Sequence, residues 1–357
     1  MRSDKMSEWE KNLLDIAPYV AGEQPDNDKI IKLNANENPY PPSPMVEKAL
    51  AELDAKELKK YPDANGTPLV KLLAEKHGIG TENVFVGNGS DDVLALSFRA
   101  FFNSDKPILY PDITYSFYPV WCDLLKIPYK LCPVDENFKI DPKDYYAENG
   151  GVVIANPNAP TSICEGKEFI LDILEHNKDC VVIVDEAYVD FGTYSAVELI
   201  SKYENLLVTQ TFSKSRSLAG MRVGMAFGSE KLISCLKAVK DSYNSYPLDT
   251  AAQTAACAAI EDEVYFMRTV MRVKQTRDDT AQSLRELGFK VLESGTNFLF
   301  ASHPDFSAEQ IFSYLRENGI FVRYFKKPRI DNFLRITVGT DEQMKLMCEL
   351  LTKLIIK

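Results

Sequence analysis

The feature that most constrains the fold of this chain is a regular alternation of short apolar runs with amphipathic stretches between about residues 80 and 230. The apolar runs occupy residues 84–86, 107–110, 151–155, 181–184, 206–209 and 223–227. Several are apolar at every position, which is typical of strands covered on both faces in a mostly parallel sheet. Stretches 91–101 and 166–176 have the length of crossover helices. We therefore predict an α/β domain here.

The pattern changes after about residue 230. A long, mainly helical stretch covers about 229–287 and crosses Tyr246 and Pro247. Short strands are expected near 290–292, 297–301, 322–324 and 333–338, with a helix at 308–318 among them. This ending predicts a second, smaller α+β domain. The first 35 residues show no strand pattern, and we expect them to form an arm that packs on the smaller domain.

Charge and cysteine content limit the classes of function. The formal net charge of −11 argues against a nucleic-acid surface. Seven cysteines without a CxxC pair indicate reduced thiols rather than a disulfide framework. The N-terminal segment has no apolar signal core, and no apolar run approaches the ~18 residues that a membrane span requires. We therefore expect a soluble cytoplasmic protein with no membrane partner.

In a doubly wound sheet, ligands bind at the carboxyl ends of the strands, so the residues after each strand carry the functional information. The segment GNGSD at 87–91 opens a helix and could hold an anion, although Ser90 or Asp91 could equally be an ordinary helix cap. Tyr115 could lie over a flat ligand or belong to the core. Asn158 lies between two prolines, where it could donate an amide proton or only form a turn.

Two further strands are followed by charged residues. Asp185 follows apolar residues 181–184, where an unpaired carboxylate is costly, so it needs a cationic partner. A salt bridge to any nearby arginine would also satisfy it. Lys214 follows the strand at 206–209 and could be an amine nucleophile whose pKa is lowered by burial and by neighbouring cations. A solvated basic loop is the commoner fate of a single lysine.

The five strand ends are more informative together than singly. They offer an anion cradle, a stacking aromatic, an amide donor, a carboxylate and a lysine. Pyridoxal phosphate requires this combination, because it is held by a lysine amine, a carboxylate partner for its ring nitrogen and a phosphate site. A nicotinamide-dependent dehydrogenase is disfavoured because no strand is followed by GxGxxG. No metal site is expected, since His77, His176 and His303 show no ligand spacing.

Several motifs resemble those of the fold-type I pyridoxal-phosphate aminotransferases and, within them, the histidinol-phosphate aminotransferase family. The motifs are LNANENP at 33–39, KYPD at 60–63, GNGSD at 87–91, VDEAY at 184–188, TFSK at 211–214, AGMRVG at 219–224 and LRITVG at 334–339. The resemblance implies an aspartate-aminotransferase-like α/β fold: a large domain with a mostly parallel, seven-stranded type of sheet covered by helices, plus a smaller α+β domain. The expected divisions are an N-terminal arm (1–40), a large cofactor-binding domain (41–246) and a small domain (247–357).

The resemblance also implies roles for individual residues. Lys214 would be the Schiff-base lysine and proton shuttle, Asp185 would face the ring nitrogen, and Tyr188 would contact the ring oxygen. The remaining cofactor contacts implied are Gly89, Ser90, Asp91, Tyr115, Ser213 and Arg222. Tyr61 would reach the phosphate in the neighbouring subunit, which implies a homodimer. The substrate side would be lined by Tyr19, Asn34, Arg323 and Arg335, with the two arginines binding carboxylate and phosphate groups.

One motif departs from the family pattern. The family usually has Asn-Asn-Pro-Thr-Gly, whereas this chain has Ala159 at the second asparagine and Ser162 at the glycine. We expect Asn158, one residue earlier, to supply the amide. The implied reaction is amino transfer from glutamate to imidazole-acetol phosphate, giving histidinol phosphate and 2-oxoglutarate. An aromatic or broad-specificity aminotransferase and a threonine-phosphate decarboxylase are alternatives on the same scaffold. The role of Arg216 stays open between the phosphate site and solvent, with a supporting role favoured.

Overall fold

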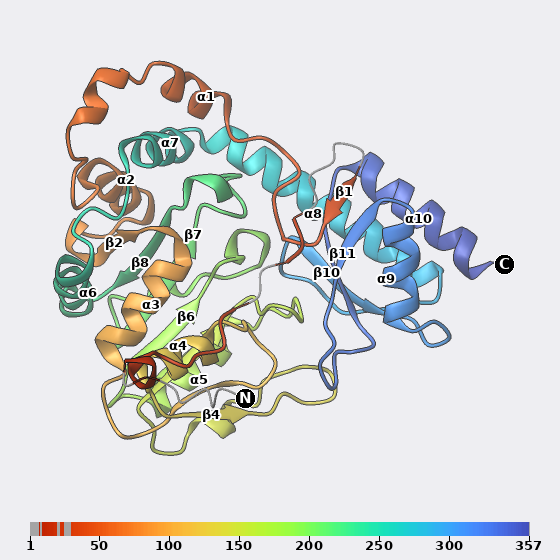
Figure 1. The fold of residues 1–357 in the computed structure, drawn as a ribbon, viewed down its shortest axis with the longest axis horizontal. Helices are drawn as coiled ribbons and strands as arrows, with labels where there is room; N and C mark the ends of the chain where they lie inside the picture. Colours follow the sequence, from red (N-terminus) through yellow and green to blue (C-terminus); the bar gives the residue numbers. More distant parts are fainter. Residues whose placement is uncertain (1–6, 8, 20–21, 25–29, 357) are drawn as a thin grey trace.

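The computed structural model describes residues 7, 9–19, 22–24 and 30–356, and its centre is a seven-stranded sheet. The strand order is β2-β8-β7-β6-β5-β3-β4, and only β8 runs antiparallel to its neighbours (Figure 1). The strands are β2 (Val84–Gly87), β3 (Ile108–Pro111), β4 (Tyr129–Cys132), β5 (Gly151–Ala155), β6 (Val182–Asp185), β7 (Leu206–Thr211) and β8 (Gly224–Gly228). The six apolar runs therefore all form strands, and edge strand β4 is an addition, since its first three residues are exposed and carry little apolar signal.

Helices cover both faces of this sheet, which explains why its central strands are apolar throughout. Val152 and Ile154 of β5 belong to one buried cluster, whereas Val153 and Ala155 belong to the cluster on the opposite face. The first cluster is covered by α1 (Pro44–Ala51), α2 (Thr67–His77), α5 (Lys167–His176) and α7 (Thr250–Glu261). The second is covered by α3 (Gly89–Phe101), α4 (Tyr118–Leu125) and α6 (Glu230–Tyr243). Alternate side chains thus pack in opposite directions, as the period of a strand requires.

A smaller mixed sheet with the order β1-β11-β12-β10-β9 forms the other part of the molecule (Figure 1). Its strands are β1 (Ile31–Leu33), β9 (Lys290–Val291), β10 (Phe298–Ser302), β11 (Ile320–Tyr324) and β12 (Leu334–Thr337). Helices α8 (Glu263–Glu286), α9 (Ala308–Glu317) and α10 (Asp341–Ile355) pack beside it. The expected fold class, a large mostly parallel α/β part and a smaller α+β part, is confirmed. No helix among the described residues is both long and apolar enough to span a bilayer.

The expectation that the first 35 residues contain no strand is wrong for one segment. Residues Ile31–Leu33 form β1, which pairs in parallel with β11, so that Leu33 lies opposite Val322. A three-residue strand is too short to show a period, and its partner lies far along the chain. Part of the predicted arm (residues 1–6, 8, 20–21 and 25–29) lies outside the described residues.

The domain boundaries stay predictions, and the packing of α7 suggests where to revise one of them. Ala255 and Ala256 of α7 lie in the same buried cluster as Val208 of β7. In contrast, Ala281 and Leu284, near the end of α8, pack with the small sheet. We therefore propose that the change of domain falls within α8 rather than at residue 247.

Candidate active site

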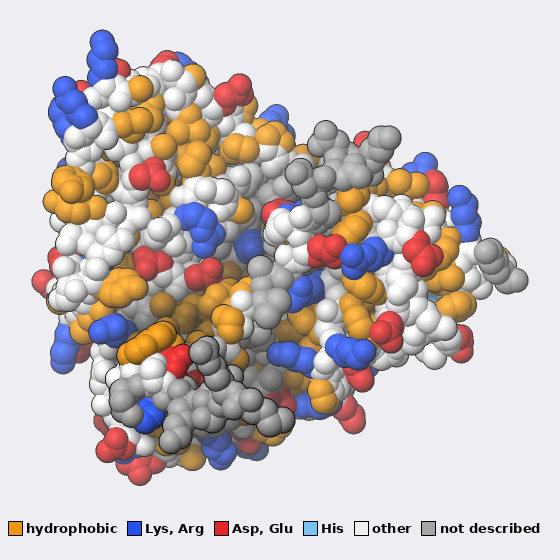
Figure 2. Space-filling view, viewed as in Figure 1, with side chains coloured by type: hydrophobic (Ala, Val, Ile, Leu, Met, Phe, Trp, Pro, Cys, Tyr) orange, Lys and Arg blue, Asp and Glu red, His pale blue; other side chains and the backbone are white. Residues whose placement is uncertain are grey.

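A cavity of about 240 Å³ lies at the carboxyl ends of β5, β6 and β7. Its lining includes eight of the residues predicted from the sequence: Ser90, Asp91, Tyr115, Asp185, Tyr188, Ser213, Lys214 and Arg222. The space-filling view shows a hollow between the large and small parts of the molecule, with Lys or Arg side chains in and beside it (Figure 2). The parallel strands thus bring together side chains that lie more than 120 positions apart in the chain.

One end of the cavity is built from backbone and glycine. Gly89 begins α3 with a φ of 85°, and a Cβ added there would lie 2.5 Å from a terminal guanidinium nitrogen of Arg222. A Cβ added at Gly224 would lie 2.3 Å from the carbonyl carbon of Gly89. Both glycines are therefore required for the close approach of strand β8 to the start of α3. The backbone amides of a helix start and a nearby guanidinium make this end suitable for a phosphate.

Asp91 organises the polar groups beside this cradle. One of its carboxylate oxygens accepts a hydrogen bond from Tyr115 Oη at 2.8 Å. The other lies 3.3 Å from Nη2 of Arg222. Burial and the neighbouring carboxylate raise the pKa of Tyr115, so its phenol stays protonated and continues to donate. Asp91 therefore fixes the Tyr115 ring at the cavity wall.

Asp185 ends strand β6 as a buried carboxylate. It accepts hydrogen bonds from Tyr118 Oη at 2.8 Å and from Thr209 Oγ1 at 3.3 Å. Burial raises the pKa of Asp185 to about 6, although both hydrogen bonds act in the opposite direction. No ion pair to Asp185 is formed by any residue that the structure describes. A buried carboxylate facing a cavity without a cation is suited to a ligand that carries a protonated nitrogen.

Lys214 lies just beyond strand β7 and lines the same cavity. Its Nζ is 5.8 Å from the centre of the Tyr188 ring. Asn38 Nδ2 donates to the carbonyl oxygen of Lys214 at 3.0 Å, which ties the N-terminal segment to the lysine loop. A lysine amine and a buried carboxylate therefore lie on the walls of one small cavity.

The structure does not bring Asn158 into this cavity. Its amide hydrogens are used by the carbonyl oxygen of Ile113 and by Thr161 Oγ1, each at 2.9 Å. Its Oδ1 accepts from Thr114 Oγ1 at 2.7 Å. Ala159, the next residue, lines the cavity instead. The expectation that Asn158 donates to a ligand therefore receives no support, because its amide is saturated inside the loop.

Asn36 is a site residue that the sequence reasoning did not single out. Its Nδ2 donates to Tyr188 Oη at 2.8 Å. The motif at 33–39 contains three asparagines, Asn34, Asn36 and Asn38, and thus offered Asn36 as a candidate. Only Asn34 was predicted to face the substrate. Sequence spacing cannot tell which of these side chains points inward.

Arg323 and Arg335 lie directly opposite each other on the antiparallel strands β11 and β12. Like charges in this position repel, and burial together with Arg323 lowers the pKa of Arg335. Arg335 Nη2 donates to the carbonyl oxygen of Asn34 at 2.9 Å, whereas its buried Nε has no partner within the described part of the chain. This pair of cations therefore favours an anionic ligand.

The other predicted substrate residues lie around this pair. The buried Oδ1 of Asn34 also lacks a described partner, while its Nδ2 donates to the carbonyl oxygen of Glu23 at 2.9 Å. Tyr19 stacks on Phe117, with ring centres 4.3 Å apart.

Tyr61, in contrast, is 82% exposed and stacks on Tyr246 away from the cavity lining of its own chain.

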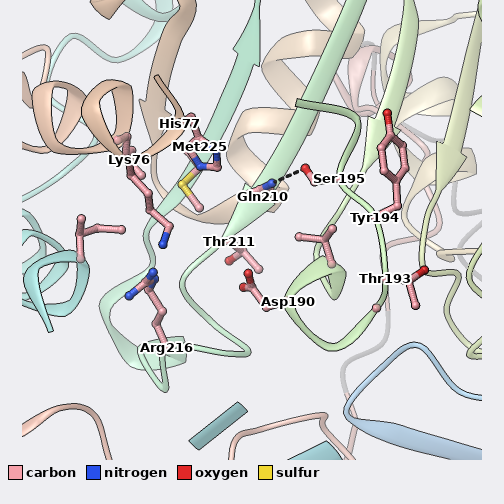
Figure 3. Close-up of a pocket in the computed structure, with 14 residues that line it drawn as sticks. Lys76, His77, Asp190, Thr193, Tyr194, Ser195, Gln210, Thr211, Arg216 and Met225 are labelled. Carbon is pink, nitrogen blue, oxygen red and sulfur yellow. Dashed lines mark hydrogen bonds between the residues drawn. The ribbon is translucent and has the colours of Figure 1, made fainter. Parts of the chain in front are cut away.

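Arg216 faces a second cavity, of about 230 Å³, rather than the first (Figure 3). Its guanidinium lies 3.8 Å from the centre of the Phe266 ring, donates to the carbonyl oxygen of Ala259 and lies 3.4 Å from a carboxylate oxygen of Glu263. Lys76 bonds the same carboxylate at 2.8 Å. Arg216 therefore joins the lysine loop to α7 and α8. Its side chain lies neither in the phosphate cradle nor in solvent.

A comparison with family models identifies the class of protein to which this fold and this site belong. Residues 28–351 match the family model described as "Aminotransferase class I and II". The chain therefore belongs to this family.

Comparison with curated relatives narrows the assignment. The chain is 54% identical over 342 residues to a histidinol-phosphate aminotransferase of Acinetobacter baumannii (strain SDF), covering 95% of each chain. It is 49% identical to the histidinol-phosphate aminotransferase of Lactococcus lactis, covering 96% of this chain and 95% of the relative. The chain is thus a member of the histidinol-phosphate aminotransferase family.

A solved structure shows the same fold. The histidinol-phosphate aminotransferase of Sinorhizobium meliloti, determined in complex with pyridoxal-5'-phosphate, superimposes with a TM-score of 0.83 at 22% identity and covers 91% of each chain.

Proposed function

We propose that this chain is a pyridoxal-phosphate-dependent enzyme that transfers an amino group from glutamate to imidazole-acetol phosphate, giving histidinol phosphate and 2-oxoglutarate. The observation that carries the proposal is one cavity lined by Lys214 and by Asp185, a buried carboxylate with no cationic partner among the described residues. The glycine cradle lies beside them. The named relatives at 49–54% identity supply the substrate class.

The residues of the cavity fit pyridoxal phosphate from end to end. Gly89, Ser90, Ser213 and Arg222 would hold the phosphate, because the start of α3 and the Arg222 guanidinium meet at this end of the cavity. Asp185 would face the ring nitrogen and keep it protonated, which also supplies the cation that the buried carboxylate lacks. When bound, the cofactor supplies an electron-accepting ring that stabilises negative charge on the substrate carbon.

Lys214 would hold the cofactor through its amine and then move the proton at the substrate carbon. Its place on the loop directly after β7 would keep the amine near this carbon, because β7 is buried along its whole length and anchors the loop. Proton transfer by a positioned side chain typically contributes 10²–10⁴-fold to a rate, on the order of 3–5 kcal/mol. Tyr188 and Tyr115 would orient the ring from two sides of the cavity.

Arg335 and Arg323 would bind the anionic ends of the two substrates. A guanidinium binds a carboxylate or a phosphate through two parallel hydrogen bonds, so one pair of arginines can accept both glutamate and the phosphorylated substrate in turn. The unpaired Nε of Arg335 leaves a donor available for this purpose, whereas the unpaired Oδ1 of Asn34 would accept from a donor group of the substrate. Tyr19 would lie beside the imidazole ring.

A homodimer would complete the site. Tyr61 is 82% exposed and stacks on Tyr246, which is 44% exposed, so both rings are accessible to a second subunit. In the dimer, Tyr61 of one subunit would reach the cofactor phosphate of the other. Location in the cytoplasm agrees with seven free cysteines.

The test is amino transfer from glutamate, measured with imidazole-acetol phosphate and with phenylpyruvate as alternative acceptors. We expect activity with the phosphorylated acceptor to exceed that with phenylpyruvate at least 10-fold, since the Arg323–Arg335 pair favours a dianion. Lys214→Ala should abolish turnover and the visible absorbance of bound cofactor, whereas Lys231→Ala on the exposed face of α6 should change neither. Equal use of both acceptors, or release of carbon dioxide from a phosphorylated amino acid, would overturn the assignment.

A further inference from the structure

The phenol of Tyr188 has a partner from a distant part of the chain. Asn36, which follows β1 in the N-terminal segment, is 2% exposed and donates through Nδ2 to Tyr188 Oη at 2.8 Å. The two residues are separated by 152 positions. The proposed reaction does not by itself require a hydrogen bond from the buried Asn36 amide to the Tyr188 phenol.

The orientation of the Asn36 amide follows from its other hydrogen bonds. Its backbone N–H donates to Thr337 Oγ1 at 3.0 Å, and Thr337 Oγ1 donates back to Asn36 Oδ1 at 3.1 Å. Asn297 Nδ2 donates to the Asn36 carbonyl oxygen at 2.9 Å. If the amide were turned over, the buried hydroxyl proton of Thr337 would lose this acceptor. The nitrogen of Asn36 therefore faces Tyr188, and the phenol oxygen accepts.

This hydrogen bond leaves the Tyr188 proton free for an acceptor other than Asn36. A phenol has one proton, and because its oxygen already accepts from Asn36, that proton is free to be donated elsewhere. Tyr188 lines the cavity together with Lys214 and Asp185. A phenol that accepts one hydrogen bond is also a better donor in the next one.

The same wall of the cavity lacks the usual second donor. Ala159 lines the cavity where the family pattern has an asparagine, and the Asn158 amide is saturated by Ile113 and Thr161. A ligand oxygen at this wall would therefore depend on Tyr188 as its donor, without help from that loop.

We propose that Asn36 is a positioning residue that aims the Tyr188 phenol proton at the ring oxygen of pyridoxal phosphate, in place of the amide that Ala159 cannot provide. The inference rests on the proposed function, because it requires that cofactor in the cavity. Asn36 is held by Thr337 of β12 and by Asn297 just before β10. The small sheet therefore sets the hydrogen bonding of a residue on the large domain.

The experiment is a pH titration of the visible absorbance of the cofactor-loaded protein without substrate. The absorbance reports the protonation state of the bound cofactor. Asn36→Gly removes the amide but tolerates the backbone φ of 55° at this position. We expect its titration midpoint to rise by up to about one pH unit, because the Tyr188 phenol, no longer held by Asn36, would lose its hydrogen bond to the charged ring oxygen. Tyr188→Phe should shift the midpoint in the same direction, and the double variant should shift no further than Tyr188→Phe alone.

Asn36→Asp is a second variant that is expected to fold, because it preserves the size of the side chain and tolerates a positive φ. It replaces the Nδ2 donor with an acceptor oxygen. It should shift the midpoint at least as far as Asn36→Gly. An unchanged midpoint in a folded Asn36 variant, beside a shifted Tyr188→Phe, would overturn the positioning role and leave the proposed function intact. A wild-type protein that binds no pyridoxal phosphate would overturn the proposed function and this role together.

Discussion

Replacing Asp185 with Asn should stabilise the cofactor-free protein and at the same time remove its amino-transfer activity. Burial raises the pKa of Asp185 from 3.8 to about 6. At about 1.4 kcal/mol per pKa unit, keeping this carboxylate ionised at pH 7 costs the cofactor-free fold ~3 kcal/mol. The side chain is buried, so solvent screens little of this cost.

Asparagine removes the charge but fits the hydrogen-bond donors less well. Tyr118 and Thr209 both donate to Asp185, and an amide has a single acceptor oxygen for two donors. One lost hydrogen bond offsets ~1 kcal/mol, which leaves a net gain of ~1–2 kcal/mol at pH 7.

The pH dependence gives the sharper test. The pKa is raised in the folded state, so the protonated carboxyl contributes stability fully below about pH 4, and that contribution is lost as pH rises through about 6. Urea unfolding of Asp185→Asn and of the unaltered protein, at equal concentration, should therefore give a gain at pH 7 that shrinks by ~1 kcal/mol at pH 5. Asp105→Asn on the surface is the matched control and should show no gain. An Asp185→Asn variant that is less stable at both pH values, or a gain independent of pH, would refute the reasoning.

Three further substitutions test other parts of the site. Gly224→Ala places a Cβ 2.3 Å from Gly89 and should weaken cofactor binding at least 10-fold in equilibrium dialysis, whereas Gly220→Ala, whose Cβ would meet nothing within 4 Å, should not. Arg335→Lys loses the two-pronged contact and should lower kcat/KM for glutamate about 30-fold, ~2 kcal/mol, in steady-state kinetics. Tyr61→Phe should weaken cofactor binding about 10-fold by dialysis without changing the apparent mass in sedimentation; unchanged binding would place Tyr61 outside the site.

The positions of the strand-end residues could be predicted from the sequence because a parallel sheet imposes a simple rule. The apolar runs that form parallel strands end at the same edge, so Ser90, Tyr115, Asp185 and Lys214 had to meet there once these runs were recognised as strands. Short-range patterning is enough for such a prediction.

Other features could not be predicted because they depend on side-chain direction. Asn158 follows a strand in the same way, yet its amide turns into its own loop and bonds Ile113 and Thr161. Arg216 lies two residues from Lys214 but points toward Phe266 and Glu263. No spacing rule gives the direction of a side chain in an irregular loop.

The sequence by itself determined the alternation of buried strands and helices, the absence of apolar spans, and the set of groups that chemistry with pyridoxal phosphate requires. The tertiary structure alone decided that β1 joins the small sheet and that Asn36 reaches Tyr188. The physical reason is separation along the chain: a local pattern encodes burial, whereas a contact across 152 residues or more forms only when distant segments have come together in the folded chain.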